Sequence, residues 1–140
     1  MAKIEVWLAR TPYGFDATDE AGVRMKMDNS AAGCGQGYGV SPMQSLLMAL
    51  GGCSGIDVVS ILKKQRQTIE GFEMKIEGAR QQGVEPSLWE NVKIVFELKG
   101  NIDMDKARRA CQLSMDKYCS VAETLRKAGC ELTWDVVVNK

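Results

Sequence analysis

The residues of this sequence best suited to chemistry are its five cysteines, which are Cys34, Cys53, Cys111, Cys119 and Cys130. No two of them form a C-x-x-C pair, and the sequence contains no histidine. Zinc sites of the usual spacing and histidine-assisted nucleophilic catalysis are therefore disfavoured. We expect no metal and no cofactor. A reactive thiol would owe its activation to burial geometry, a helix terminus, an arginine or a carboxylate.

Cys53 lies in an apolar segment, residues 41–66, that predicts a long helix. Ser41 and Gln44 form an S-x-x-Q capping box, with Pro42 at the first helical position. Cys53 falls on the face made by apolar residues at helical spacing, which are Met43, Leu46, Leu47, Leu50, Val58, Ile61 and Leu62. Lys63, Lys64 and Arg66 end the segment, where cations suit the helix dipole.

Two features distinguish Cys53 from an ordinary core cysteine. Gly51 and Gly52 precede it, and a glycine pair within a helix indicates close approach of another element or a kink. No charged residue occurs between Asp28 and Asp57, so the thiol is expected in an apolar setting with Asp57 one turn further on. Free cysteine is also a common core residue, and from the helix alone both interpretations stay open.

Cys119 lies at a predicted break between two helices. Asp103 is expected to cap an amphipathic helix, whose predicted inner face is Met104, Ala107, Cys111, Ser114, Met115 and Tyr118. Ser120 and Glu123 form a second capping box, which predicts a short helix that starts at Ser120 and ends before Gly129. Cys119 then precedes a helix N-terminus, whose partial positive charge favours a thiolate. The alternative is a small residue that fills the junction.

The remaining elements predict an α+β chain. Alternating apolar and polar residues indicate strands near residues 3–8, 15–17 and 23–28, as an antiparallel meander with one buried face. Residues 72–77 and 92–99 indicate a hairpin, and residues 132–138 a last strand. Cys111 and Cys130 are expected in the core. Cys34 falls in a glycine-rich stretch without the G-K-[ST] ending of a phosphate loop, which is interpreted as a mobile connector.

Composition bounds the class of protein. The 140 residues fit a single domain, residues 1–140, without repeats. Eighteen basic and eighteen acidic residues leave no net charge and no basic block, so neither nucleic-acid nor anionic-membrane binding is supported. Gly, Ser, Gln and Pro interrupt the uncharged stretch between Asp28 and Asp57, which is therefore not expected to span a membrane. The N-terminus lacks a signal-peptide pattern, and a cytoplasmic location is expected.

Both cysteine contexts together resemble the OsmC/Ohr family of thiol-dependent peroxidases. Residues 41–64 read SPMQSLLMALGGCSGIDVVSILKK, and residues 117–125 read KYCSVAETL. The order of strands and helices agrees over the whole chain. The resemblance implies an OsmC-like fold, with antiparallel sheets wrapped around a long central helix. It also implies an intertwined homodimer with active sites at the subunit interface, and an apolar helix of this length in so short a chain favours dimerisation independently.

The resemblance implies a role for each of the two cysteines. Cys53 would be the peroxidatic cysteine, which attacks a small apolar hydroperoxide, and Cys119 the resolving cysteine, with an external dithiol as reductant in a stress-protection role. Family peroxidases add an arginine from the N-terminal strands, for which Arg10 is the first candidate and Arg24 the second. They also use a glutamate near the start of the central helix, where this sequence has Met43 and Gln44.

Two other functions remain open because Gln44 supplies no charge. The same two cysteines would serve a non-peroxidatic protein for thiol redox or sulfur handling. The cleft would equally serve a non-enzymatic dimer that binds a small apolar ligand. Loss of a thiol on peroxide addition separates the first two functions from the third, and turnover with a dithiol separates the first from the second.

Overall fold

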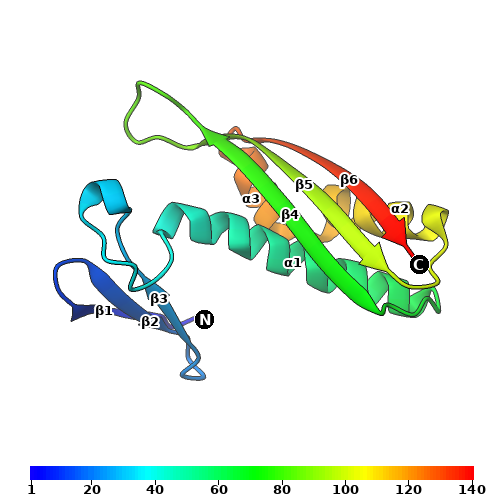
Figure 1. Ribbon diagram of the computed structural model, residues 1–140, viewed down its shortest axis with the longest axis horizontal. Helices are drawn as coiled ribbons and strands as arrows, with labels where there is room; N and C mark the ends of the chain where they lie inside the picture. The colour runs from blue at the N-terminus through cyan, green and yellow to red at the C-terminus, as the bar shows by residue number, and fades with distance from the viewer. The chain divides into compact units, whose positions relative to one another are not determined.

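The computed structural model describes residues 1–140, which group into two compact units, Met1–Leu46 and Leu47–Lys140. The order of elements is three strands, a long helix, two strands, two helices and a last strand, which confirms the α+β prediction (Figure 1). The organisation as one domain stays a prediction.

The first unit is built on a three-stranded sheet. Strands β1 (Glu5–Arg10), β2 (Gly14–Thr18) and β3 (Arg24–Met27) pair antiparallel in that order, so the predicted meander is confirmed.

The expected buried apolar face of this meander is wrong. Phe15 is exposed, whereas its neighbour Asp16 is buried. The Asp16 carboxylate accepts hydrogen bonds from the Tyr38 hydroxyl and from Arg24 Nη1, the latter at 2.8 Å. Asp16 is therefore buried on β2 with its hydrogen bonds satisfied, whereas apolar side chains such as Leu8 remain exposed.

The glycine-rich connector is ordered around one carboxylate. The backbone N–H groups of Gln36 and Tyr38 both donate to Asp28 Oδ2, at 2.9 and 3.0 Å. These bonds hold the pKa of Asp28 below its ordinary value, because they favour the ionised form. The connector also contains a 3₁₀ turn (η1, Ala31–Gly33), followed by the exposed Cys34. It is thus a hydrogen-bonded loop, in contrast to the mobile connector expected from its glycines.

Helix α1 (Pro42–Lys64) runs without interruption for 23 residues. Ser41 Oγ accepts a hydrogen bond from the Gln44 N–H at 3.3 Å, which confirms the predicted start. By length and composition α1 could cross a membrane, which differs from the expectation that its small and polar residues prevent this. Core helices of soluble proteins meet the same criterion. Only 33% of its most apolar stretch is buried within this chain.

Glycines in α1 allow the close approach of a strand. A Cβ built on Gly51 would lie 3.0 Å from Ile76 Cδ1, and one on Gly55 would lie 2.8 Å from Met74 Cε. Both contacts are to strand β4 (Gly71–Arg80). The expected close approach is therefore found at Gly51, whereas Gly52 faces open space.

The second unit has a three-stranded sheet of order β4-β5-β6. Strands β4 and β5 (Trp89–Lys99) form the predicted antiparallel hairpin, but β6 (Glu131–Asn139) pairs parallel with β5. The sheet is thus mixed, and its pairing differs from the antiparallel sheets that the resemblance implied. The two helices between β5 and β6 supply the crossover that a parallel pair requires.

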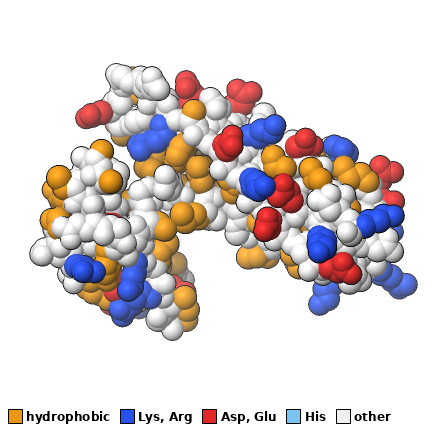
Figure 2. All heavy atoms as spheres, viewed as in Figure 1, with side chains coloured by type: hydrophobic (Ala, Val, Ile, Leu, Met, Phe, Trp, Pro, Cys, Tyr) orange, Lys and Arg blue, Asp and Glu red, His pale blue; other side chains and the backbone are white.

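All helices of this unit lie on one face of the sheet (Figure 1). The β5 residues that point to this face are buried, namely Val92, Ile94, Phe96 and Leu98. On the opposite face Lys and Glu side chains mix, as Figure 2 shows, and Lys75 pairs with Glu97 at 3.5 Å. The core of the second unit therefore lies between the sheet and the helices.

Helix α2 (Met104–Leu113) begins at the predicted cap, where the Asp103 carboxylate accepts a hydrogen bond from the Lys106 N–H at 3.0 Å. Of its predicted inner face, four residues are buried as expected, namely Ala107, Cys111, Ser114 and Met115. Met104 and Tyr118 are exposed, so their assignment to the core was wrong.

Candidate active site

The chain leaves α2 through a π-helical turn (η2, Ser114–Tyr118) and enters α3 (Ser120–Lys127) at Cys119. The Cys119 N–H donates to the Ser114 carbonyl at 2.8 Å, which closes the wide turn. Cys119 is extended, with φ −76° and ψ 103°. Single π turns often occur at functional sites. The predicted break is therefore present, and it is centred on a cysteine.

Cys119 itself caps α3. Its Sγ accepts a hydrogen bond from the Ala122 N–H at 3.4 Å. The sequence placed the cap one residue later, at Ser120, because serine is a far commoner cap than cysteine. The correction puts the thiol in direct contact with the first turn of the helix.

Cys53 is half-buried on α1, and its side chain lies close enough to Cys119 to raise the pKa of that thiol. The other cysteines of the second unit, Cys111 and Cys130, are buried in the core as predicted. The structure thus brings together the two cysteines that the sequence singled out. Nowhere in the structure do three or more Cys, Asp or Glu side chains gather closely enough to hold a metal ion.

The Cys119 thiol is protonated at neutral pH. Burial raises its pKa to about 11, the Ala122 N–H lowers it, and Cys53 and Asp57 raise it further. The prediction that the helix N-terminus makes Cys119 easy to ionise is therefore wrong. One N–H donor does not offset the loss of solvent around a residue that is only 3% exposed. Burial likewise raises the pKa of Cys111, to about 12.

A buried serine ties the π turn to α1. The Ser114 hydroxyl donates to Asp57 Oδ2 at 3.0 Å and lies 3.4 Å from the Ser54 carbonyl. Ser114 is fully buried, whereas Asp57 is half-buried. Apart from the place of Ser114 on an inner helical face, no sequence pattern predicts this contact. The Cys119 N–H bonds to the backbone of the same turn. The hydrogen bond between Ser114 and Asp57 therefore holds Cys119 beside the helix that carries Cys53.

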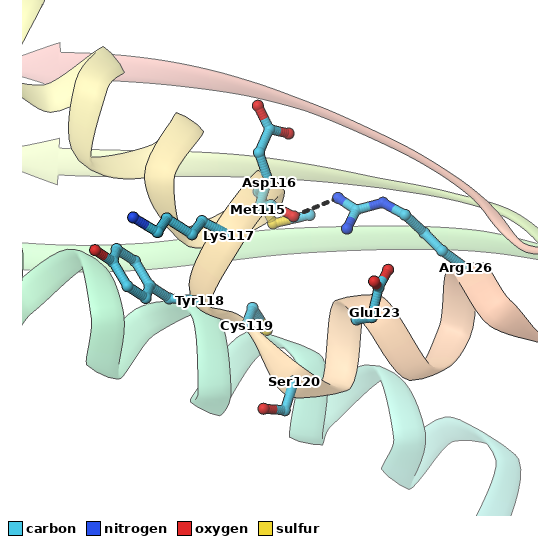
Figure 3. Close-up of a pocket in the computed structure, with 8 residues that line it drawn as sticks. All are labelled: Met115, Asp116, Lys117, Tyr118, Cys119, Ser120, Glu123 and Arg126. Carbon is cyan, nitrogen blue, oxygen red and sulfur yellow. Dashed lines mark hydrogen bonds between the residues drawn. The ribbon is translucent and has the colours of Figure 1, made fainter.

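A cavity of about 240 Å³ opens beside the junction. Figure 3 shows the residues that line it, which are Met115, Asp116, Lys117, Tyr118, Cys119, Ser120, Glu123 and Arg126. Two cations and two carboxylates balance its charge. Arg126 donates from Nη2 to the Met115 carbonyl, as the dashed line shows. The guanidinium therefore braces the π turn from the side of α3.

The other candidate residues, Arg10, Arg24 and Gln44, belong to the first unit. The Arg10 guanidinium lies 5.9 Å from the centroid of the Tyr38 ring, and Arg24 bonds to Asp16. Each arginine therefore has a partner within its own unit. A role for either arginine, or for Gln44, beside Cys53 stays a prediction.

Comparisons with known proteins agree with these features. The sequence matches the family model for OsmC-like proteins over residues 35–135. It is 47% identical over 89 residues to protein YhfA of Escherichia coli (strain K12), across 63% of this chain and 66% of that relative. The match thus spans slightly less than two thirds of the relative's length.

Solved structures show the same fold. A hypothetical protein from Aquifex aeolicus VF5 is 27% identical, with a TM-score of 0.82 over 100% of this chain and 98% of that one. An organic hydroperoxide resistance protein OsmC from Legionella pneumophila has a TM-score of 0.73 over 97% and 96% of the two chains. At 13% identity, this second likeness shows the fold alone.

Proposed function

The chain belongs to the OsmC-like protein family, and from this premise we propose that it is a thiol-dependent peroxidase that reduces organic hydroperoxides. In this proposal Cys53 is the peroxidatic cysteine and Cys119 the resolving cysteine. The observation that carries it is the proximity of these two side chains at a π turn, within the segment that matches the family. Peroxide reduction by this route needs two thiols close together.

The proposed reaction has three steps. The Cys53 thiolate attacks the terminal oxygen of the hydroperoxide, an S–O bond forms and the O–O bond breaks. The leaving alkoxide takes a proton from solvent and departs as the alcohol, and Cys53 is left as a sulfenic acid. The sulfur of Cys119 then attacks the Cys53 sulfur, an S–S bond replaces the S–O bond, and water leaves. An external dithiol reduces this disulfide by thiol–disulfide exchange and is itself oxidised.

The surroundings of Cys53 favour an apolar substrate. Most neighbouring positions on α1 are glycine or apolar, and no charged residue precedes Asp57 on the helix. An alkyl hydroperoxide gains from burying its carbon chain on such a surface, whereas hydrogen peroxide has no chain to bury. We therefore assign the specificity to organic hydroperoxides. We also propose that the protein works in the cytoplasm, without a membrane or nucleic-acid partner.

A peroxide-consumption assay tests the proposal. Hydrogen peroxide, tert-butyl hydroperoxide and a fatty-acid hydroperoxide are compared, each with dithiothreitol or dihydrolipoamide as reductant. The expected order is organic hydroperoxides before hydrogen peroxide, with multiple turnovers. A reaction with every peroxide that is no faster than that of free cysteine would overturn it.

The peroxidase is proposed to act as a homodimer, because α1 carries an apolar stripe that this chain leaves uncovered. Met48, Ile56 and Val59 are 54%, 70% and 44% exposed. Gly52 lies between them at helical spacing and has open space around it. A second copy of the chain is the partner proposed to cover this stripe, since burial of such area is what stabilises permanent dimers.

Sedimentation at micromolar concentration is expected to give twice the chain mass of 15.4 kDa. Ile56→Glu is expected to shift the protein to monomer, because it places a charge at the centre of the stripe. Val84→Glu is the matched control, since Val84 is a similarly exposed residue in the loop between β4 and β5. A stable wild-type monomer would contradict the dimer.

The residue at position 44 is expected to limit the rate. Gln44→Glu should raise peroxide turnover about fivefold, because a carboxylate holds a guanidinium about 1 kcal/mol more firmly than an amide does. Gln112→Glu, an exposed position on α2, controls for the added charge. Neutralising Arg10 should lower the rate if Arg10 is the partner, with Arg24 the next to test. An unchanged rate in Gln44→Glu would mean that position 44 does not support the thiolate.

A second candidate function follows from the same residue. Because Gln44 supplies no charge, the two thiols would also suit a non-peroxidatic redox protein that forms the Cys53–Cys119 disulfide without rapid peroxide turnover. Loss of thiols on oxidation, without turnover in the presence of a dithiol, would favour this candidate. Unchanged thiols would favour the binding of a small apolar ligand.

A further inference from the structure

Formation of the proposed disulfide requires that Cys119 lose its proton. The thiol is 3% exposed, and its pKa of about 11 means that roughly one molecule in 10⁴ carries a thiolate at neutral pH. The chain has no histidine to accept the proton. The resolving step therefore needs another base at the junction.

Asp57 is placed for this task. It lies four residues after Cys53 on α1, hence on the same helical face. Its carboxylate accepts a hydrogen bond from the Ser114 hydroxyl at 3.0 Å, and the Ser114 carbonyl in turn accepts from the Cys119 N–H at 2.8 Å. One fully buried serine thus fixes both the carboxylate and the backbone of the resolving cysteine.

The other charged groups near Cys119 are less suited. Asp116, Lys117, Glu123 and Arg126 line the cavity beside the junction, and the Arg126 guanidinium is engaged by the Met115 carbonyl. Asp57 is the carboxylate whose charge acts on the Cys119 thiol, and it does so from the helix that carries Cys53. It therefore lies on the helix that carries one of the two sulfur atoms, and its charge acts on the other.

Building on the peroxidase function proposed above, we propose that Asp57 is the proton acceptor for Cys119 during disulfide formation. The Cys119 proton passes to the Asp57 carboxylate, directly or through one water molecule. The Cys119 sulfur attacks the Cys53 sulfur, the S–S bond forms and the S–O bond breaks. The leaving hydroxide takes the proton from Asp57 and departs as water. Cys119 is oxidised and the sulfenic sulfur is reduced, while Asp57 returns to its carboxylate form.

Removal of the Asp57 charge changes the rate of disulfide formation in opposite directions for a proton acceptor and for a passive charge. A passive negative charge hinders ionisation of Cys119, so its removal would speed disulfide formation. A proton acceptor promotes the reaction, so its removal slows it. General-base catalysis is typically worth about 10²–10⁴-fold.

The test is a single turnover with one equivalent of tert-butyl hydroperoxide. Sulfenic acid on Cys53 is trapped with dimedone, and the disulfide is followed by mass spectrometry. Asp57→Asn retains an acceptor for the Ser114 hydroxyl. It is expected to form sulfenic acid at the wild-type rate but the disulfide about 100-fold more slowly. Asp57→Glu should restore most of the rate.

The pH profile of the resolving step gives a second measurement. The wild-type rate should show a plateau around neutral pH, because the Asp57 carboxylate accepts the proton, whereas the Asp57→Asn rate should rise about tenfold per pH unit toward the pKa of the thiol. A disulfide that forms in Asp57→Asn as fast as in wild type, or faster, overturns the inference. A wild-type rate of disulfide formation without a plateau also overturns the inference, and this measurement does not depend on whether a variant folds. Absence of sulfenic acid on wild-type Cys53 instead overturns the peroxidase function itself.

Discussion

Replacing Cys53 by serine is expected to abolish the consumption of organic hydroperoxides, with a loss of more than about 10³-fold in rate. A serine hydroxyl is not ionised at neutral pH and does not form a sulfenic acid, so the first step has no nucleophile. The measurement is peroxide loss with dihydrolipoamide as reductant.

Cys34→Ser is the control for this experiment. Cys34 is the exposed thiol of the chain and lies in the first unit, in a loop ordered by Asp28. It should retain wild-type turnover. Activity that survives in Cys53→Ser and disappears in Cys34→Ser would move the reactive thiol to the connector and contradict the assignment.

Replacing Cys119 by serine is expected to stop the reaction after one turnover when no reductant is present. The second thiol is then missing, so the sulfenic acid on Cys53 persists. Mass spectrometry should find Cys119→Ser heavier by one oxygen atom after one equivalent of hydroperoxide. The wild-type protein should instead lose two hydrogen atoms as its disulfide forms.

Mapping of the wild-type disulfide checks the same assignment without a variant. Mild oxidation is expected to link Cys53 to Cys119, whose side chains already lie close together. A dominant disulfide that involves Cys34, Cys111 or Cys130 would contradict it. Cys111 and Cys130 are buried elsewhere in the core and should stay reduced.

Local sequence signals predicted the helices well because their ends depend on neighbouring residues. The Ser41 and Asp103 caps form as expected, and the chain breaks where the sequence places a break. Sequence reasoning misses the cap of α3, which is Cys119 and not Ser120, since capping scales favour serine over cysteine at adjacent positions. The two reactive candidates were found from their context in the sequence, and the structure places their side chains together.

Properties that depend on packing could not be read from the sequence. The pKa of Cys119 depends on how much solvent the surrounding elements remove, and that term outweighs the helix terminus. The burial of Asp16 in the first sheet depends on hydrogen bonds from Arg24 and Tyr38, which lie 8 and 22 positions further along the chain. The contact between Asp57 and Ser114 likewise joins residues separated by 57 positions.

The Cys119 sulfur atom caps α3, so its chemistry affects the conformation of the N-terminus of this helix. The atom that accepts the Ala122 N–H is the atom proposed to enter the disulfide. Oxidation at that atom would therefore alter a backbone hydrogen bond, and with it the first turn of a helix whose Ser120 and Glu123 side chains are exposed. The oxidation state of a buried thiol would in this way change the conformation of residues at the surface of the protein.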